Sequence, residues 1–113
     1  RAARGGDAPV DMANALIEEN GCVVFSKSTC PFCSMAKKVL TKDLGAKCKV
    51  VEMDQELSGE DMSTLQDHFL ATTGARSVPR VFVGGECIGG GTDVTALKGK
   101  GELQPMLEKA GAL

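Results

Sequence analysis

The sequence predicts an α/β domain whose four-stranded mixed sheet is flanked by helices on both faces. Its 113 residues fit one domain, since domains typically have about 100–200 residues. Two short apolar runs are joined by a helical pattern, which predicts neighbouring parallel strands and a right-handed crossover. Two later strand patterns are separated only by Gly84-Gly85, which is a strong signal for an antiparallel hairpin.

The N-terminal part of the chain is expected to contain a tail and then a helix. We expect residues 1–8 to form a disordered tail and residues 9–113 to form the folded domain. Asp7 or a neighbour is expected to cap a helix that reaches about Asn20. Pro9 fits the first turn of that helix, where its missing N–H leaves no bond unmade.

The next three elements follow from apolar patterning and glycine positions. Residues 22–25 form a continuous apolar run, as a buried central strand requires. Apolar residues then recur at helical spacing from about Pro31 until Gly45, which ends the helix. Residues 48–53 alternate in the way that predicts a second strand.

The second half of the chain is expected to add three helices and the hairpin. Ser58 begins a capping-box pattern, so a helix should run from there to Gly74. Leu65, Phe69 and Leu70 of this helix are expected to face the core. The remaining elements are a strand at 80–83, a strand at 86–88, a helix from Thr92 or Asp93 to about Lys98, and a last helix at about 102–110.

Composition excludes several classes of function. The formal net charge of −2 and the pI near 5.4 provide no basic field for nucleic acid. No apolar run approaches the ~18 residues of a membrane span and no signal-peptide core is visible, so we expect no membrane partner. Five cysteines are an odd number for a domain that can form a core without disulfides. We therefore expect a reducing compartment, the cytoplasm or an organelle such as the mitochondrion, and not a secreted disulfide scaffold.

Charge is distributed unevenly along the chain. Six lysines and one acid, Asp43, lie between Lys27 and Lys49, and five acids without a base lie between Glu52 and Asp61. The acidic stretch is interpreted as a solvated face. The basic stretch surrounds a pair of cysteines, so we expect it to create a local positive field around them.

A Cys-Pro-Phe-Cys motif lies where the first strand leads into a helix. In a βαβ unit this spacing is typical of a thioredoxin-like redox site. Cys30 should lie at the helix N-terminus, where unpaired N–H groups and Lys27 favour a thiolate and lower its pKa. Cys33, one turn further on, should be more buried and less favoured as an anion. Two thiols with unequal pKa values supply the nucleophile and the resolving group of thiol–disulfide exchange.

A zinc site is the other interpretation of this motif, and it is disfavoured. Tetrahedral zinc usually requires a second close pair of ligands, whereas Cys48, Cys87 and His68 stand alone in the sequence. We therefore expect no metal site. Cys22 is interpreted as a small buried hydrophobic side chain, Cys48 is ambiguous, and Cys87 is either a spectator or an oxidation-sensitive thiol.

Two further segments are candidates for ligand contacts. Ser77-Val78-Pro79 is either an ordinary turn or a cis-proline segment that leaves the Val78 backbone free to pair with a peptide-like ligand. Gly89–Asp93 is a glycine-rich turn that opens a helix, and its N–H groups either bind a carboxylate or phosphate or merely reverse the chain. It lacks the GxGxxG order, so dinucleotide binding is not supported.

With these motifs, the sequence resembles dithiol glutaredoxins that have a CPYC-like active site. The resemblance spans about Pro9 to Leu113 and depends on four motifs in the same order. These motifs are Lys27–Cys33, Gln66-Asp67, Thr73–Val83 and Cys87–Asp93. Phe32 and Ser77 stand where Tyr and Thr are common, and neither change removes a catalytic group. The resemblance implies a thioredoxin fold and a glutathione-dependent activity.

The resemblance also implies roles for individual residues. Cys30 would be the nucleophile and Cys33 the resolving thiol, with glutathione as reductant and no permanently bound cofactor. Val78 before cis-Pro79 would pair with the cysteinyl backbone of glutathione. The full set of glutathione-binding residues implied in this way is Lys27, Phe32, Gln66, Arg76, Val78, Pro79, Gly90, Thr92 and Asp93. Thr92 and Asp93 would hold the γ-glutamyl end, while Lys27, Gln66 and Arg76 would face the glycine carboxylate.

The implied partners are glutathionylated or disulfide-containing proteins, with glutathione reductase and NADPH acting indirectly, and we expect a monomer. One alternative is a dimer that binds a [2Fe–2S] cluster through the first active-site Cys and glutathione, which Pro31 disfavours in this family. A second alternative is a thioredoxin. Thioredoxins typically carry Trp-Cys-Gly-Pro-Cys, whereas this chain has no Trp and places Thr29 before Cys30.

Overall fold

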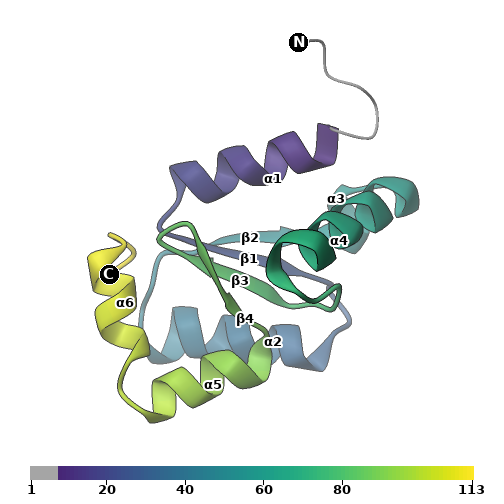
Figure 1. Ribbon diagram of the computed structural model, residues 1–113. Helices are drawn as coiled ribbons and strands as arrows, with labels where there is room; N and C mark the ends of the chain where they lie inside the picture. The colour runs from purple at the N-terminus through teal and green to yellow at the C-terminus, as the bar shows by residue number, and fades with distance from the viewer. Residues whose placement is uncertain (1–7) are drawn as a thin grey trace.

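In the computed structural model, which describes residues 8–113, a four-stranded sheet lies between two layers of helices (Figure 1). The strand order is β2-β1-β3-β4, and β1 (Cys22–Ser26) runs parallel to β2 (Lys49–Glu52). On its other side β1 is antiparallel to β3 (Arg80–Val83), which forms the predicted hairpin with β4 (Glu86–Gly89). The predicted mixed sheet with helices on both faces is confirmed.

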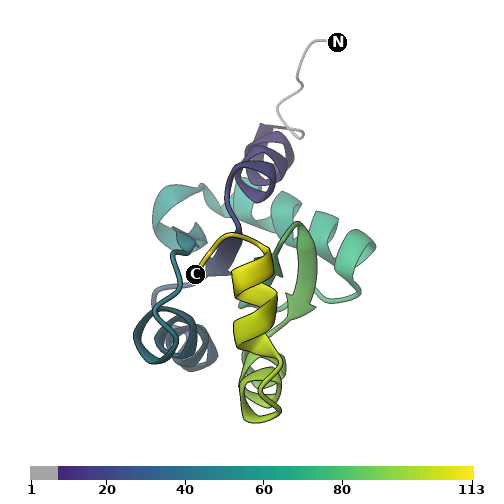
Figure 2. The same cartoon turned by 90° about the vertical axis from the view of Figure 1, so that its left-hand side faces the viewer.

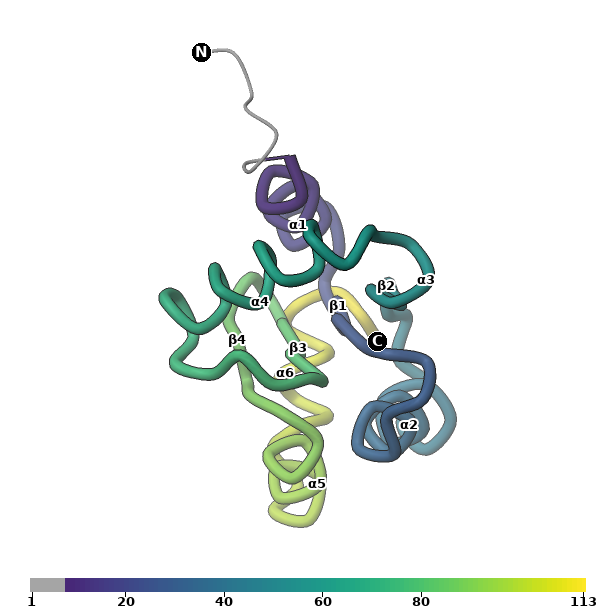
Figure 3. The backbone as a smooth tube through the Cα atoms, turned by 90° about the vertical axis from the view of Figure 1, so that its right-hand side faces the viewer, coloured from purple at the N-terminus to yellow at the C-terminus, as the bar shows by residue number. Residues whose placement is uncertain are grey.

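One face of the sheet is covered by α1 (Ala8–Glu19), α3 (Met53–Glu56) and α4 (Gly59–Thr73) (Figure 3). Its core contains three aromatic rings, two from strands of the sheet and one from α4. Phe25 of β1 packs on Phe69 of α4 with ring centroids 4.9 Å apart, and on Phe82 of β3 at 5.8 Å. Because all three side chains are buried, this cluster fixes α4 over the centre of the sheet.

The opposite face is covered by α2 (Pro31–Lys37), its π-helical continuation η1 (Lys38–Asp43), α5 (Gly91–Gly99) and α6 (Leu103–Lys109) (Figures 1 and 2). Val24 and Val81 of the central strands are fully buried against Leu40 and Leu103 of these helices. The alternation of side chains along each strand divides the core between the two faces. Ala36 of α2 is buried in the same cluster, and this packing holds α2 at the end of β1.

Three local features differ from the sequence predictions. The helix after the cysteine motif changes to π-helical hydrogen bonding, and Thr41 Oγ1 there donates to the Lys37 carbonyl (2.7 Å), a side-chain bond that competes with the backbone ladder. The single turn α3 was not predicted, because four residues are too few to show a periodicity. The prediction for Leu70 is wrong, since its side chain is 50% exposed and Gln66 occupies the buried face of α4.

The predicted tail and the predicted cap at Asp7 lie outside the described residues. The one described member of that predicted tail, Ala8, is the first residue of α1. Across residues 8–113, no helix is both long enough and apolar enough to span a membrane.

A disulfide joins Cys22 and Cys48, which corrects the interpretation of Cys22 as a simple hydrophobic side chain. The parallel register pairs Val23 with Lys49, so the residues one position earlier also lie opposite each other, with Cα atoms 4.6 Å apart. Cys22 is fully buried, and Lys47 beside the disulfide donates its N–H to the Ala112 carbonyl (2.8 Å). The C-terminal residues thus cover this end of β1.

Candidate active site

The Cys-Pro-Phe-Cys segment forms the first turn of α2 at the other end of β1. Cys30 is the N-cap residue, with extended backbone angles (φ −90°, ψ 119°), and its Sγ accepts a hydrogen bond from the Cys33 N–H (3.3 Å). Pro31 occupies the first helical position, where no N–H is needed. The Cys30 sulfur therefore lies against the unpaired N–H groups of the helix, as predicted.

This position favours the thiolate form of Cys30. Its partial burial disfavours the charge, but hydrogen bonds from the Cys33 side chain and backbone outweigh that cost. The Phe32 N–H and the positive charge of Lys27 act in the same direction. The pKa of Cys30 is consequently lowered from its ordinary value of 9.0.

Cys33 has the opposite character. It is fully buried, and burial, followed by the side-chain hydrogen bond to Cys30, raises the pKa of its thiol to about 11. The backbone of Lys27 and the hydroxyl of Ser26 offset only part of this increase. Cys33 therefore keeps its proton at neutral pH and stabilises the neighbouring thiolate, which gives the unequal pair of thiols that the sequence predicted.

The turn before Cys30 is fixed by an acid that was not predicted. The Cys30 N–H donates to the Lys27 carbonyl (3.1 Å), and this closes the turn. Asp54 of α3 accepts hydrogen bonds from both the N–H (2.9 Å) and the hydroxyl (2.5 Å) of Ser28. These two bonds lower the pKa of Asp54 and join the turn to α3. Because α3 itself gave no sequence signal, Asp54 could not be assigned to this place.

A cis peptide bond between Val78 and Pro79 lies next to the cysteine pair, as the second interpretation of that segment anticipated. The carbonyl oxygen of Val78 is 3.9 Å from the Cys30 sulfur. Within residues 8–113, the Val78 N–H donates to no other group. The Val78 N–H is therefore free to pair with an extended ligand beside Cys30.

A groove of about 380 Å³ runs from this segment to the N-terminus of α5. Six of the predicted binding residues line it together with Ser77, Arg80 and Gly91: Phe32, Val78, Pro79, Gly90, Thr92 and Asp93. The other three predicted residues, Lys27, Gln66 and Arg76, are not part of its lining.

The glycine-rich turn holds α5 against the active-site turn. A Cβ placed on Gly91 would lie 2.9 Å from the Phe32 carbonyl oxygen, so only glycine permits this approach without displacement. Asp93 accepts a hydrogen bond from the Gly90 N–H (2.8 Å), which fixes its carboxylate at the end of the groove. The turn thus brings Thr92 and Asp93 to the side of α5 that lines the groove.

Gln66 and Arg76 are engaged in local contacts. The Gln66 Nε2 donates to the Arg76 carbonyl (3.1 Å), so the buried amide supports the loop that leads to the cis-proline. The Arg76 side chain donates to Asp67 (2.8 Å) and to Ser63 (3.0 Å) on α4. Both residues therefore support the loop, and neither belongs to the lining of the groove.

Fewer lysines contribute to the positive field at Cys30 than the sequence predicted. Lys37 forms an ion pair with Glu52 (2.7 Å). Lys38 and the distant Lys98 both pair with Asp43, at 3.1 Å and 3.0 Å. Of the lysines in this stretch, Lys27 alone contributes to the lowered pKa of Cys30.

The remaining cysteine and the histidine lie elsewhere. Cys87 and His68 line a separate hollow of about 340 Å³ between α1, α4 and the hairpin. Over the part of the chain that the structure describes, no three His, Cys, Asp or Glu side chains gather as a metal-ligand set.

A mixed β2-β1-β3-β4 sheet, a helix that starts at a reactive cysteine and an adjacent cis-proline define a thiol–disulfide oxidoreductase of the thioredoxin fold. Residues 22–88 match the family model described as glutaredoxin, and the chain belongs to the glutaredoxin family. The predicted fold and family are confirmed.

Relatives and solved structures agree with this assignment over nearly the whole chain. A glutaredoxin from Ricinus communis is 47% identical over 98 residues, covering 87% of this chain and 92% of the relative. Glutaredoxin-1 from Oryctolagus cuniculus is 42% identical over 103 residues, covering 91% and 96%. The crystal structure of a buckwheat glutaredoxin–glutathione complex superposes with a TM-score of 0.86 at 37% identity, covering 100% of this chain and 99% of the other.

Proposed function

We propose that this protein is a glutathione-dependent oxidoreductase that reduces protein–glutathione mixed disulfides and protein disulfides. The observation that carries this proposal is the position of the Cys30 sulfur at the N-terminus of α2, 3.9 Å from the carbonyl oxygen of Val78, whose N–H is unpaired among the described residues. The lowered pKa of Cys30 favours the thiolate at this position. The adjoining groove of about 380 Å³ lies within the ~300–1,000 Å³ usual for small-molecule sites. The buckwheat relative whose structure is a glutathione complex supports glutathione as the ligand.

The groove suggests one orientation for glutathione. Its cysteinyl backbone would pair with Val78, which places its sulfur next to Cys30. Its γ-glutamyl end would lie at Thr92 and Asp93, at the N-terminus of α5. Its glycine carboxylate would then face the side of Lys27, whose charge also acts on Cys30.

The first chemical step is an exchange of disulfide partners. The Cys30 thiolate attacks the glutathione sulfur of a mixed disulfide, a Cys30–glutathione bond forms, and the client protein leaves as its thiolate. The lowered pKa of Cys30 supplies the anion without a separate base. The raised pKa of Cys33 prevents the second thiol from competing for the substrate.

Two branches complete the cycle. In the first, a second glutathione thiolate attacks the sulfur of the bound glutathione, which releases glutathione disulfide and regenerates the Cys30 thiolate. In the second, Cys33 loses its proton and attacks the Cys30 sulfur, glutathione leaves as a thiolate, and a Cys30–Cys33 disulfide remains. Two glutathione molecules reduce that disulfide and are oxidised to glutathione disulfide, which glutathione reductase and NADPH recycle.

Single substitutions of the two cysteines separate these branches. We expect Cys30→Ser to abolish turnover of a glutathionylated peptide, because it removes the nucleophilic sulfur that lies 3.9 Å from the Val78 carbonyl oxygen. Cys33→Ser should retain this turnover through the first branch but lose reduction of protein disulfides. Turnover is measured in an assay coupled to glutathione reductase, with the wild-type protein as the reference. Equal loss in the Cys30 and Cys33 variants would contradict the first branch.

The cluster-binding alternative is tested in the same preparation. Pro31 occupies the first turn of α2 directly after Cys30, and in this family that residue disfavours a [2Fe–2S] cluster. After anaerobic incubation with iron, sulfide and glutathione, we expect a colourless monomer by absorbance and size-exclusion chromatography. A coloured dimer that loses its colour on Cys30→Ser substitution would favour cluster binding over the proposed reaction.

A further inference from the structure

Arg80, the first residue of β3, is a buried cation at the base of the groove. Its residue surface is only 6% exposed. Its Nε donates to the Pro79 carbonyl (3.2 Å), and its Nη1 donates to the hydroxyl of Thr73 (3.3 Å) and lies 4.0 Å from the Cys87 sulfur. Within residues 8–113, no carboxylate forms an ion pair with it.

The hydrogen bonds of this guanidinium involve Nε and Nη1, and they leave Nη2 without a partner among the described residues. Burying a cation is unfavourable unless it is paired, and the acceptors at Pro79 and Thr73 are neutral. Thr73 is the last residue of α4, so the partial negative charge of that helix end helps to stabilise Arg80. An anion on the other side of the guanidinium would complete the compensation.

That other side opens on the groove. Arg80 belongs to the groove lining, and its Nη2 lies 3.3 Å from the point where a Cβ on Gly90 would stand. The backbone of Gly90 is extended (φ −102°), so any residue could adopt it. What Gly90 provides is space, because a side chain there would cover Nη2.

We propose that Arg80 determines specificity by binding a carboxylate of the ligand through Nη2, namely the α-carboxylate of the γ-glutamyl unit. This inference rests on the proposed glutathione site. The choice of carboxylate follows from the residues at that end of the groove, where Asp93 holds a fixed anion next to Gly90. An α-amino acid group carries both charges, so an acid and a buried guanidinium at one end match its ammonium and carboxylate.

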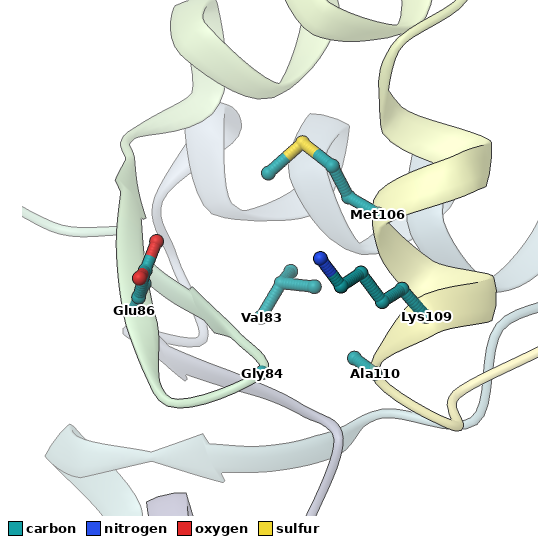
Figure 4. A pocket seen from close by; sticks show the side chains of 6 residues that line it. All are labelled: Val83, Gly84, Glu86, Met106, Lys109 and Ala110. Atoms are coloured by element: carbon teal, nitrogen blue, oxygen red, sulfur yellow. The ribbon is translucent and has the colours of Figure 1, made fainter.

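The test varies the protein and the ligand together. The substrates are mixed disulfides of one reporter peptide with glutathione, with an analogue that lacks only the γ-glutamyl α-carboxylate, and with an analogue amidated at the glycine carboxylate. Each is assayed for kcat/KM with the wild type, Arg80→Gln and Arg80→Lys. Lys109→Gln is the matched control, because Lys109 lies on α6 and reaches into a separate hollow opposite Glu86 of the hairpin (Figure 4).

We expect Arg80→Gln to lower kcat/KM for the glutathione substrate by about tenfold to a hundredfold, the range of a charge-assisted hydrogen bond. The same variant should cause no further loss with the analogue that lacks the γ-glutamyl carboxylate. The fall in kcat/KM that Arg80→Gln causes with the glycine-amidated analogue should equal the fall that it causes with the glutathione substrate. Arg80→Lys should be intermediate, because it keeps the charge and loses the planar fork, and Lys109→Gln should match the wild type.

A second variant, Gly90→Ala, obstructs Nη2 of Arg80 without removing the charge of the guanidinium. Gly90→Ala places a methyl group over Nη2 and should reproduce the ligand dependence of Arg80→Gln, even if the latter fails to fold. Equal losses on all three substrates, or a loss that disappears only with the glycine-amidated analogue, would overturn the proposal. A wild-type protein that turns over none of the glutathione substrates would instead overturn the proposed function itself.

Discussion

The two ends of β1 carry two pairs of cysteines with opposite properties. At its N-terminal end, Cys22 is fully buried and bonded to Cys48 across the parallel strand pair. At its C-terminal end, Cys30 is partly exposed beside Cys33, and both thiols are free. The residue types are the same, so the difference arises from what surrounds each sulfur.

Backbone geometry accounts for the difference. Cys30 lies at a helix N-terminus, where N–H groups and Lys27 stabilise a thiolate that a substrate can reach. Cys22 lies inside a strand whose N–H groups are committed to the sheet, beneath C-terminal residues that include Ala112. The N-terminus of a helix therefore favours the thiolate of Cys30. Cys22 instead lies opposite Cys48 on the neighbouring strand and forms a disulfide with it.

Removing the disulfide should affect stability and leave the chemistry intact. We expect Cys22→Ala, Cys48→Ala or the double variant to lower the free energy of unfolding by about 2–4 kcal/mol, the usual effect of a disulfide. The closed loop contains Cys30 and Cys33, but the contacts that lower the pKa of Cys30 lie at the other end of β1. Urea denaturation without reductant measures the stability, and kcat/KM is expected to stay at the wild-type value.

The control for this prediction is Cys87→Ala, which removes a free thiol from the separate hollow. In a strong reductant, the difference in the free energy of unfolding between the wild type and Cys22→Ala should become smaller. A fall in kcat/KM comparable to that of an active-site variant would show that the two ends of β1 are coupled.

Alanine substitution of one glycine near each end of β1 perturbs the two ends in the same way, and the expected loss of stability is smaller than that for the disulfide. A Cβ on Gly21 would collide with the Ala110 carbonyl beside the disulfide, and one on Gly91 would lie 2.9 Å from the Phe32 carbonyl beside the reactive cysteine. Both alanine variants should lose about 1–3 kcal/mol of stability through overpacking. Only Gly91→Ala should also change the rate at which Cys30 is alkylated.

Gly59→Ala is the control for this pair, because a Cβ there meets nothing within 4 Å at the start of α4. It should be neutral or stabilising by up to about 1 kcal/mol, since alanine favours the helix. An altered alkylation rate in Gly21→Ala, or an unaltered one in Gly91→Ala, would contradict the separation of the two ends.

The sequence predicted the parts of this molecule that have local signals. Apolar runs and glycines gave the strands and the long helices, and the spacing of Cys30 and Cys33 gave the redox pair. The segment around Pro79 and the turn at Gly90 were assigned to the site through the family resemblance, and the structure places both along one groove.

The remaining features depend on contacts between distant segments. The Cys22–Cys48 disulfide requires the strand register, which no local pattern contains, although both residues begin adjacent predicted strands. Asp54 depends on a single-turn helix without a periodicity. Arg80 resembles an ordinary strand residue, and only the fold shows that its guanidinium is buried beneath the groove.

The most direct test of the account is the pH dependence of alkylation at Cys30 and Cys33. Initial rates with iodoacetamide on the reduced protein, resolved by peptide mass, report the thiolate fraction of each cysteine. A lowered pKa means that the thiolate persists at lower pH, so Cys30 should show a midpoint below 9.0. Burial of Cys33 holds its proton, and its rate should rise only as the pH approaches about 11. Coincident midpoints, or Cys33 reacting at the lower pH, would contradict the account.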